Sequence, residues 1–267
     1  MNIFFAEWKK SHRNHFHSKM VYFSLFIWPV LLFATAYFSV KPFDTSNSSP
    51  LAKWMDPKQI SFFLITGYIG YVFFWSLVQS AWQMSWERQN GTLELIFLTP
   101  VSRVWMMYCR AGANLIEGVW MFTVFSILIV LFFDDVKVPP VENIALAFIV
   151  LCISAVVWGG ILNTIFLFSR DASILFTILE EPMQFFAGVR IPVVVLPLWG
   201  KIMAALFPLT YVLQIFRALL MEGESVIDLF PNLCLLFSML ALLVVISYLL
   251  VRKAEKHAKR TGNMVLF

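Results

Sequence analysis

Charged side chains are scarce in this chain of 267 residues. Asp, Glu, Lys and Arg make up 13% of it, whereas hydrophobic residues make up 60%. Soluble domains carry about 25% charged residues, so this composition excludes an ordinary water-soluble protein and indicates a protein of the lipid bilayer. The basic residues gather near the two ends of the chain, which suits an anionic membrane surface and gives no reason to expect a nucleic-acid partner.

Metal-binding and catalytic patterns are also lacking. The three cysteines are far apart and form no CxxC, so neither a disulfide framework nor a zinc site is expected; they are Cys109, Cys152 and Cys234. His12, His15 and His17 have no acidic or thiolate partner beside them, so we expect no metal there. Without GxxxxGK[ST], HExxH or GxSxG, the chain is not expected to be an enzyme. If ATP and Mg²⁺ are used, another chain must bind them.

Long apolar runs are abundant. A helix needs about 20 residues to cross the hydrocarbon core of a bilayer. Six runs meet this length: 20–40, 60–82, 112–133, 143–168, 172–190 and 229–251. They predict an all-α membrane protein with a six-span domain over 20–251, joined on the outer side by loops 41–59 and 134–141. Lys and Arg are more frequent in the connections on the side of the termini, which predicts that both termini are cytoplasmic, in a bacterial plasma membrane.

The two ends of the chain carry different patterns. In residues 1–19, apolar Ile3, Phe5 and Trp8 alternate with charges at roughly helical spacing, which predicts an amphipathic helix lying on the cytoplasmic membrane surface. A merely basic leader is the alternative. Residues 252–267 are predicted to form a basic cytoplasmic tail.

A polar segment, residues 86–103, interrupts the apolar sequence after the second run. Gly91 is expected to end the preceding helix. Thr92 then caps a new short helix, with Glu94 in its first turn, where the helix dipole favours a carboxylate.

The second half of this segment predicts another short helix. Thr99 reads as its cap and Pro100 as its first residue, where the missing N–H costs nothing, and Arg103 closes the segment on the cytoplasmic side. Before it, Leu93, Ile96 and Phe97 share one helical face. The segment is therefore expected to form two short amphipathic helices at the cytoplasmic surface, although the periodicity alone equally fits an ordinary interfacial loop helix.

The literal string ERQNGTLELIFLTPVSR, residues 87–103, resembles the signature that follows the second span in permease subunits of the type-2 family of ATP-binding-cassette (ABC) exporters. The later strings FFAGVRIP, LPLW, FPLTY and RALL, between residues 185 and 220, look like the stretch between that family's fifth and sixth spans. The tail beginning at Arg252 is similar to the family's ending.

The resemblance implies that residues 86–103 are the coupling segment, which docks on a separate ABC ATPase. The matching candidates are Glu87, Arg88, Gly91, Thr92, Glu94, Thr99, Pro100 and Arg103. It also implies two ATPase copies or a pair of them, and a second permease chain, identical or different. The expected function is ATP-driven export of a drug, peptide, lipid or other amphiphile.

Two carboxylates, Glu180 and Glu181, fall inside the fifth apolar run beside Pro182. Each would cost about 2.5–3.5 kcal/mol in a membrane helix if ionised, so they are candidate residues of the translocation pathway. Alternatively, they pair with an arginine, are protonated, or serve an ion-gradient-driven secondary transporter. The candidate arginines are Arg110, Arg170 and Arg190.

Polar and helix-breaking residues mark three further features. Arg110, Asn114 and Glu117 share one helical face and predict a packed polar seam. The prolines of the re-entrant segment, residues 191–217, predict short re-entrant half-helices in place of one straight span. By resemblance they form the outer gate, with candidates Pro192, Pro197, Pro208 and Tyr211. Close helix packing is expected at Gly67, Gly70, Gly159 and Gly160.

Overall fold

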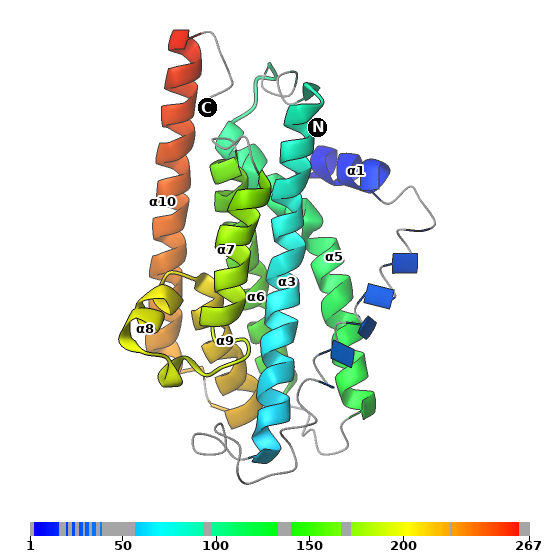
Figure 1. The fold of residues 1–267 in the computed structure, drawn as a ribbon, viewed down its shortest axis with the longest axis vertical. Coiled ribbons are helices and arrows are strands. Elements are labelled where there is room, and N and C mark those ends of the chain that lie inside the picture. The colour runs from blue at the N-terminus through cyan, green and yellow to red at the C-terminus, as the bar shows by residue number, and fades with distance from the viewer. Residues whose placement is uncertain are drawn as a thin grey trace.

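The computed structural model describes residues 3–15, scattered positions between 20 and 38, and residues 57–92, 95, 98–132, 140–166, 172–224 and 226–261. Regular structure in these ranges is helical throughout and includes no strand, as the composition predicts. Figure 1 shows a bundle of long helices with its long axis vertical, and a short helix, α1, lying across it near one end. That end, where α10 also finishes, is called the α1 end below.

Within the described ranges, four helices are long and apolar enough to cross a membrane: α3 (Pro57–Gln89), α5 (Arg103–Phe132), α6 (Val141–Phe166) and α10 (Phe230–Thr261). A bent pair of short helices raises the number to five if it is one broken span. The six-span layout therefore remains a prediction. Most of run 20–40 lies outside the described residues, as do loop residues 41–56 and 133–139. The described positions of run 20–40 are helical. Among them, Trp28 stacks on Trp75 of α3 with ring centroids 6.0 Å apart.

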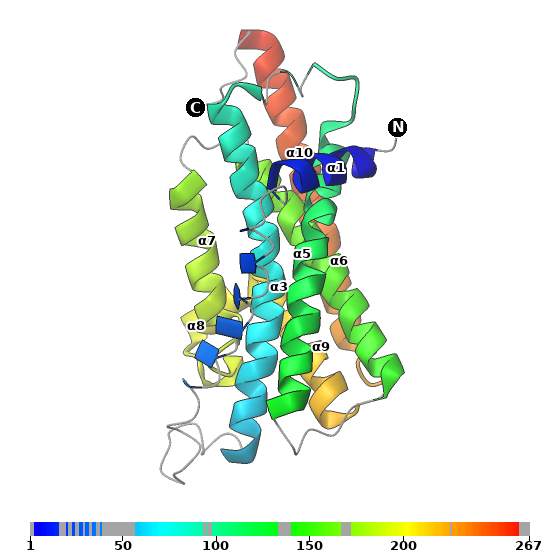
Figure 2. The same ribbon diagram turned by 90° about the vertical axis from the view of Figure 1, so that its right-hand side faces the viewer.

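Helix α3 is the centre of the bundle. In its apolar stretch 82% of the residues are buried inside the protein, whereas the corresponding share in α10 is 22%, so most of α10 faces outward and meets lipid if the bundle spans a bilayer. The core includes Phe73, Phe74 and Leu77 of α3 and Leu151 of α6, each essentially inaccessible. Figures 1 and 2 place α5 and α6 against one side of α3 and α7 (Ala172–Phe186) against another.

Two helices extend beyond the predicted spans at the α1 end. Helix α5 begins at Arg103, not at 112, and α3 continues to Gln89, beyond 82. The predicted spans exclude Glu87 and Arg110, because an ionised side chain is costly in hydrocarbon. The structure removes that cost by pairing Arg110 of α5 with Glu87 of α3, 2.7 Å apart.

Other limits differ less from the predictions. Helix α7 ends at Phe186 and not at 190, because the chain turns at Gly188, whose φ of +84° suits glycine. Helix α6 follows the predicted 143–168 closely. The predicted tail is not a separate unit up to Thr261, since α10 continues without a break to that residue; residues 262–267 lie outside the described part.

The proline-rich stretch after α7 forms short helices, and their predicted re-entrant course through the membrane remains a prediction. A 3₁₀ turn, η3 (Val193–Val195), precedes α8 (Leu198–Ala205) and α9 (Pro208–Arg217), which meet at 93°, and a π-helical turn, η4 (Ala218–Glu222), follows. The last turn extends the helical region beyond the predicted limit of 217. Helix α9 packs on α3, α6 and α10, away from the α1 end (Figure 1).

Glycines make the close helix contacts that the sequence predicts. A Cβ at Gly159 would lie 3.0 Å from Cβ of Ala111, and one at Gly70 would lie 2.6 Å from Leu213. A Cβ at Gly67 would collide with the Val189 carbonyl. These positions let α3 approach α9 and the turn after α7 more closely than any larger residue would allow.

Candidate functional site

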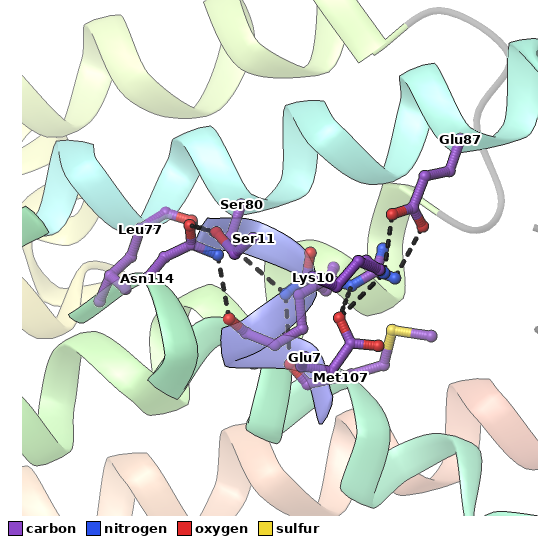
Figure 3. Close-up of polar contacts among 10 residues, drawn as sticks. Glu7, Lys10, Ser11, Leu77, Ser80, Glu87, Met107 and Asn114 are labelled. Atoms are coloured by element: carbon purple, nitrogen blue, oxygen red, sulfur yellow. Dashed lines mark hydrogen bonds and ion pairs between the residues drawn. The ribbon is translucent and has the colours of Figure 1, made fainter. Parts of the chain in front are cut away.

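Four charged side chains from three helices meet at the α1 end. Glu7 and Lys10 come from α1 (Ile3–His15), Glu87 from the end of α3 and Arg110 from the first turns of α5. We call these four residues the charge cluster. Figure 3 shows the cluster where α1 crosses α3 and α5. Two carboxylates and two cations make it formally neutral.

Each carboxylate of the charge cluster contacts both cations. Arg110 Nη2 donates to Glu87 Oε2 at 2.7 Å, and its Nε lies 3.4 Å from Glu7 Oε2. Lys10 Nζ lies 3.0 Å from Glu7 Oε2 and 2.8 Å from Glu87 Oε1. The Arg110 side chain is only 3% exposed. A buried arginine is tolerated when carboxylates compensate for its lost hydration, so the cluster holds the ends of three helices together.

A second polar contact fixes α1 beside the charge cluster. Ser11 Oγ donates to Asn114 Oδ1 at 3.2 Å, and Asn114 Nδ2 donates to the Arg110 carbonyl at 3.0 Å (Figure 3). Arg110 and Asn114, two of the three residues of the predicted polar seam, thus contact α1. Because the polar side of α1 faces protein, Phe5 and Trp8 are left exposed and are available to the membrane surface.

The Glu7 carboxyl has a pKa below its ordinary value of 4.5. Burial would raise that pKa, but the Arg110 guanidinium and the Lys10 ammonium outweigh burial and lower it. Because the pKa of Glu7 is lower in the folded protein than in the unfolded chain, ionised Glu7 stabilises the docked position of α1. This stabilisation is complete at pH values above the pKa in the unfolded chain, and it is lost as the pH falls through the pKa in the folded protein.

We therefore expect α1 to undock in acid. The Glu7 contribution should be complete above about pH 4.5 and should decline as the pH falls below it, where protonation removes the attraction of Glu7 to Arg110 and Lys10. Hydrogen exchange of α1, expressed as protection relative to the unstructured peptide at the same pH, measures this. Protection of α9, which lacks the charge cluster, is the internal control; an unchanged α1 at pH 3.5 would contradict the expectation.

The predicted coupling segment begins as expected but is capped differently. Helix α3 ends at Gln89 and the chain turns at Gly91, whose φ is +69°. Thr92 Oγ1 donates to the Glu87 carbonyl at 3.0 Å, so this side chain closes the end of α3, a role we had assigned to the start of the next helix. Thr92 and Leu95 are helical; Leu93, Glu94, Ile96 and Phe97 lie outside the described residues, as does the Arg88 side chain.

The proline in this segment is not a helix start. Thr99 and Pro100 lie in an exposed bend, and α5 begins three residues later at Arg103. The Ser102 carbonyl accepts the first bond of α5, from the Met106 N–H at 3.0 Å. Pro100 restricts the residue before it to extended conformations, which explains why the chain bends there and delays the helix.

A small apolar cluster supports the bend. Met84 of α3, Met106 and Met107 of α5 and Val251 of α10 pack together beneath it. Arg103 Nη1 donates to Glu255 Oε1 of α10 at 2.8 Å. The coupling segment therefore rests on α3, α5 and α10 at once, and α10 was not among the elements that sequence reasoning placed there.

Polar side chains also join the helices deeper in the bundle. Asn163 of α6 donates from Nδ2 to Ser80 Oγ of α3 at 3.3 Å and to the Met107 carbonyl of α5 at 3.2 Å; Figure 3 shows Ser80 and Met107 near the charge cluster. Thr164 Oγ1 lies 2.7 Å from Ser247 Oγ of α10. These contacts make the α1 end a connected unit.

Glu180 and Glu181 have different surroundings. Glu180 is 5% exposed, and Tyr71 of α3 donates its hydroxyl to Glu180 Oε1 at 2.7 Å. Glu181 is exposed. Neither forms an ion pair with Arg110, which belongs to the charge cluster, or with Arg190, which lies over the Tyr68 ring; Arg170 lies outside the described residues.

The outer-gate candidates are arranged around helix starts. Pro192 and Pro197 directly precede η3 and α8, and Pro208 is the first residue of α9. The Tyr211 hydroxyl donates to the Ala205 carbonyl at 3.2 Å and so braces the 93° bend. The prolines thus define the broken helices, as the sequence suggested.

Sequence reasoning missed Arg217 as the residue that fixes this region. Its Nη2 donates to the Phe63 and Gly188 carbonyls, each at 2.9 Å, and its Nε to Thr66 Oγ1 at 3.3 Å. Its guanidinium also lies 3.5 Å from the centroid of the Phe63 ring. The sequence does show an arginine at the end of a strongly amphipathic helix, which indicates a polar contact. It does not show which residues Arg217 contacts, because they are distant in sequence.

The comparisons with known proteins agree with this architecture. A family model described as ABC-2 type transporter matches residues 2–221. No curated protein matches the chain.

Proposed function

Because the chain belongs to the ABC-2 type transporter family, we propose that it is the membrane subunit of an ATP-driven exporter and that its α1 end docks on a separate ATPase subunit. The observation that carries this proposal is the charge cluster, which ties α1, α3 and α5 together beside the coupling segment. A displacement of that segment would therefore move the three helices together.

The direction of force transfer follows from how the elements connect. The coupling segment joins the end of α3 to the start of α5, and Arg103 and the apolar cluster add α10. Since helices packed in this way move as rigid elements, a displacement of the segment changes the positions of α3, α5 and α10. The far end, with its broken helices α8 and α9, is then the place where an outer gate opens.

The remaining parts of the proposal concern partners and substrate. ATP and Mg²⁺ bind the ATPase subunits, present as two copies or a pair, and a second permease chain, identical or different, completes the pathway. The α1 end and both termini face the cytoplasm of a bacterial cell. The substrate is an amphiphile such as a drug, peptide or lipid. Family membership does not favour the ion-gradient alternative.

Copurification tests this function. The full chain, affinity-tagged and produced with the candidate ATPase encoded beside it, should retain a subunit carrying GxxxxGK[ST], and vesicles with both chains should transport only when ATP is supplied. Transport driven by a proton gradient without ATP would contradict the proposal. The same chain produced without the ATPase is the control.

A further inference from the structure

One oxygen of the buried Glu180 carboxyl group has no hydrogen-bond partner among the described residues. Glu180 Oε2 is buried and accepts no hydrogen bond from any described residue, whereas Oε1 accepts from Tyr71 at 2.7 Å. An ionised carboxylate at such a position costs about 2.5–3.5 kcal/mol on insertion scales. Buried acceptors are almost always satisfied in native proteins, so a group from outside the chain is the natural partner for this oxygen.

Among the described residues, no cation forms an ion pair with Glu180. The described arginines that approach α3 on this side are committed elsewhere: Arg217 binds Phe63, Gly188 and Thr66, and the Arg190 guanidinium lies 5.7 Å from the centroid of the Tyr68 ring. Neither lies within ion-pair distance of Glu180, so its negative charge is uncompensated among the described residues.

The surroundings suit a charge carried on an apolar body. Met183 of α7, three residues after Glu180 and therefore on the same side of the helix, is fully buried. Tyrosine rings also attract cations through their faces. Glu181, the next residue, is exposed, so of these two carboxylates Glu180 is the buried one.

We propose that Glu180 and Tyr71 form a recognition site between α3 and α7 for the cationic group of an amphiphile, an inference that rests on the proposed export function. Tyr71 acts as a positioning residue, because its hydroxyl occupies Oε1 and leaves Oε2 for the cation. The oxygen is closed off in this conformation, so the ligand must enter when α7 moves away from α3. Helix α7 packs against α3 and α8, and Figure 2 shows it on the side of α3 away from α5.

Binding of tetraphenylphosphonium tests the site without ATP. The full chain in lipid nanodiscs is expected to bind this cation saturably in equilibrium dialysis and to bind the nearly isosteric anion tetraphenylborate more weakly, after subtraction of binding to empty nanodiscs. Equal or stronger binding of the anion by the wild-type chain would overturn the proposal. That comparison needs no variant.

Glu180→Gln removes the charge and keeps the shape. It should weaken tetraphenylphosphonium binding by at least about tenfold, because it removes the coulombic attraction between the carboxylate and the cation, which is strong in a site of low dielectric constant, and should leave tetraphenylborate binding unchanged. Tyr71→Phe should weaken cation binding by less, and Glu181→Gln is the matched control with wild-type affinity. If Glu180→Gln binds the cation as the wild type does, the carboxyl is neutral or inaccessible and the inference fails. The ATPase copurification test is independent of this result.

Discussion

Replacing Arg110 with methionine should release α1 from the bundle and abolish most ATP-dependent transport. The change leaves Glu7 and Glu87 close together with only Lys10 between them, and the side chains of these carboxylates are just 11% and 17% exposed. Removing one partner of a buried ion pair costs about 3–5 kcal/mol, and partial exposure places the expected loss near the lower end. Thermal unfolding of the purified chain and transport in vesicles measure the two effects.

Two companion variants separate charge from shape at this position. Lys9→Met removes an exposed cation from α1, the helix that Arg110 contacts, and should change neither stability nor transport. Adding Glu7→Gln and Glu87→Gln to Arg110→Met removes the unpaired carboxylates and should restore much of the lost stability. If Arg110→Met alone matches the wild type in both measurements, the charge cluster does not hold the coupling region together.

Replacing Arg217 with lysine should loosen the end of the molecule opposite α1. A lysine ammonium is a compact point charge on a flexible stem and cannot reproduce the fixed guanidinium fork that reaches Phe63, Gly188 and Thr66. Loss of one or two buried hydrogen bonds to a charged group predicts a decrease of about 2–3 kcal/mol in the free energy of unfolding. Transport should fall because α9 is no longer fixed against α3.

A neighbouring arginine gives the control for this variant. Arg190 is exposed and lies in the turn after α7, so Arg190→Lys should have almost no effect on stability. Wild-type unfolding of Arg217→Lys would show that the observed hydrogen bonds to α3 and to the Gly188 turn do not stabilise the region.

The long apolar runs made the bundle predictable, because length and hydropathy dictate which segments can cross a bilayer. Charged residues were harder to interpret. Arg110 was assigned correctly to a polar seam, but its partners come from α1 and from the end of α3, which are distant in sequence. A pattern along one helix shows which residues share a face and does not show which element packs on it.

The coupling segment illustrates the same limit at short range. Glycine predicted the turn at Gly91, where φ is positive, because that preference belongs to the residue itself. Thr92 and Pro100 were assigned to helix starts, yet Thr92 bonds the Glu87 carbonyl and Pro100 lies in a bend. Threonine and proline each suit several positions near helix ends, and tertiary packing of α5 on α3 decides among them.

Photocrosslinking from the coupling segment tests the central claim most directly. Leu98 is 76% exposed in that segment, and Leu206, between α8 and α9, is 59% exposed at the other end. With a photoreactive residue at position 98, the chain should crosslink to the ATPase subunit in the assembled complex, and at position 206 it should not. A crosslink from position 206 alone, or from neither position in a complex that hydrolyses ATP, would contradict the assignment of the α1 end as the ATPase docking surface.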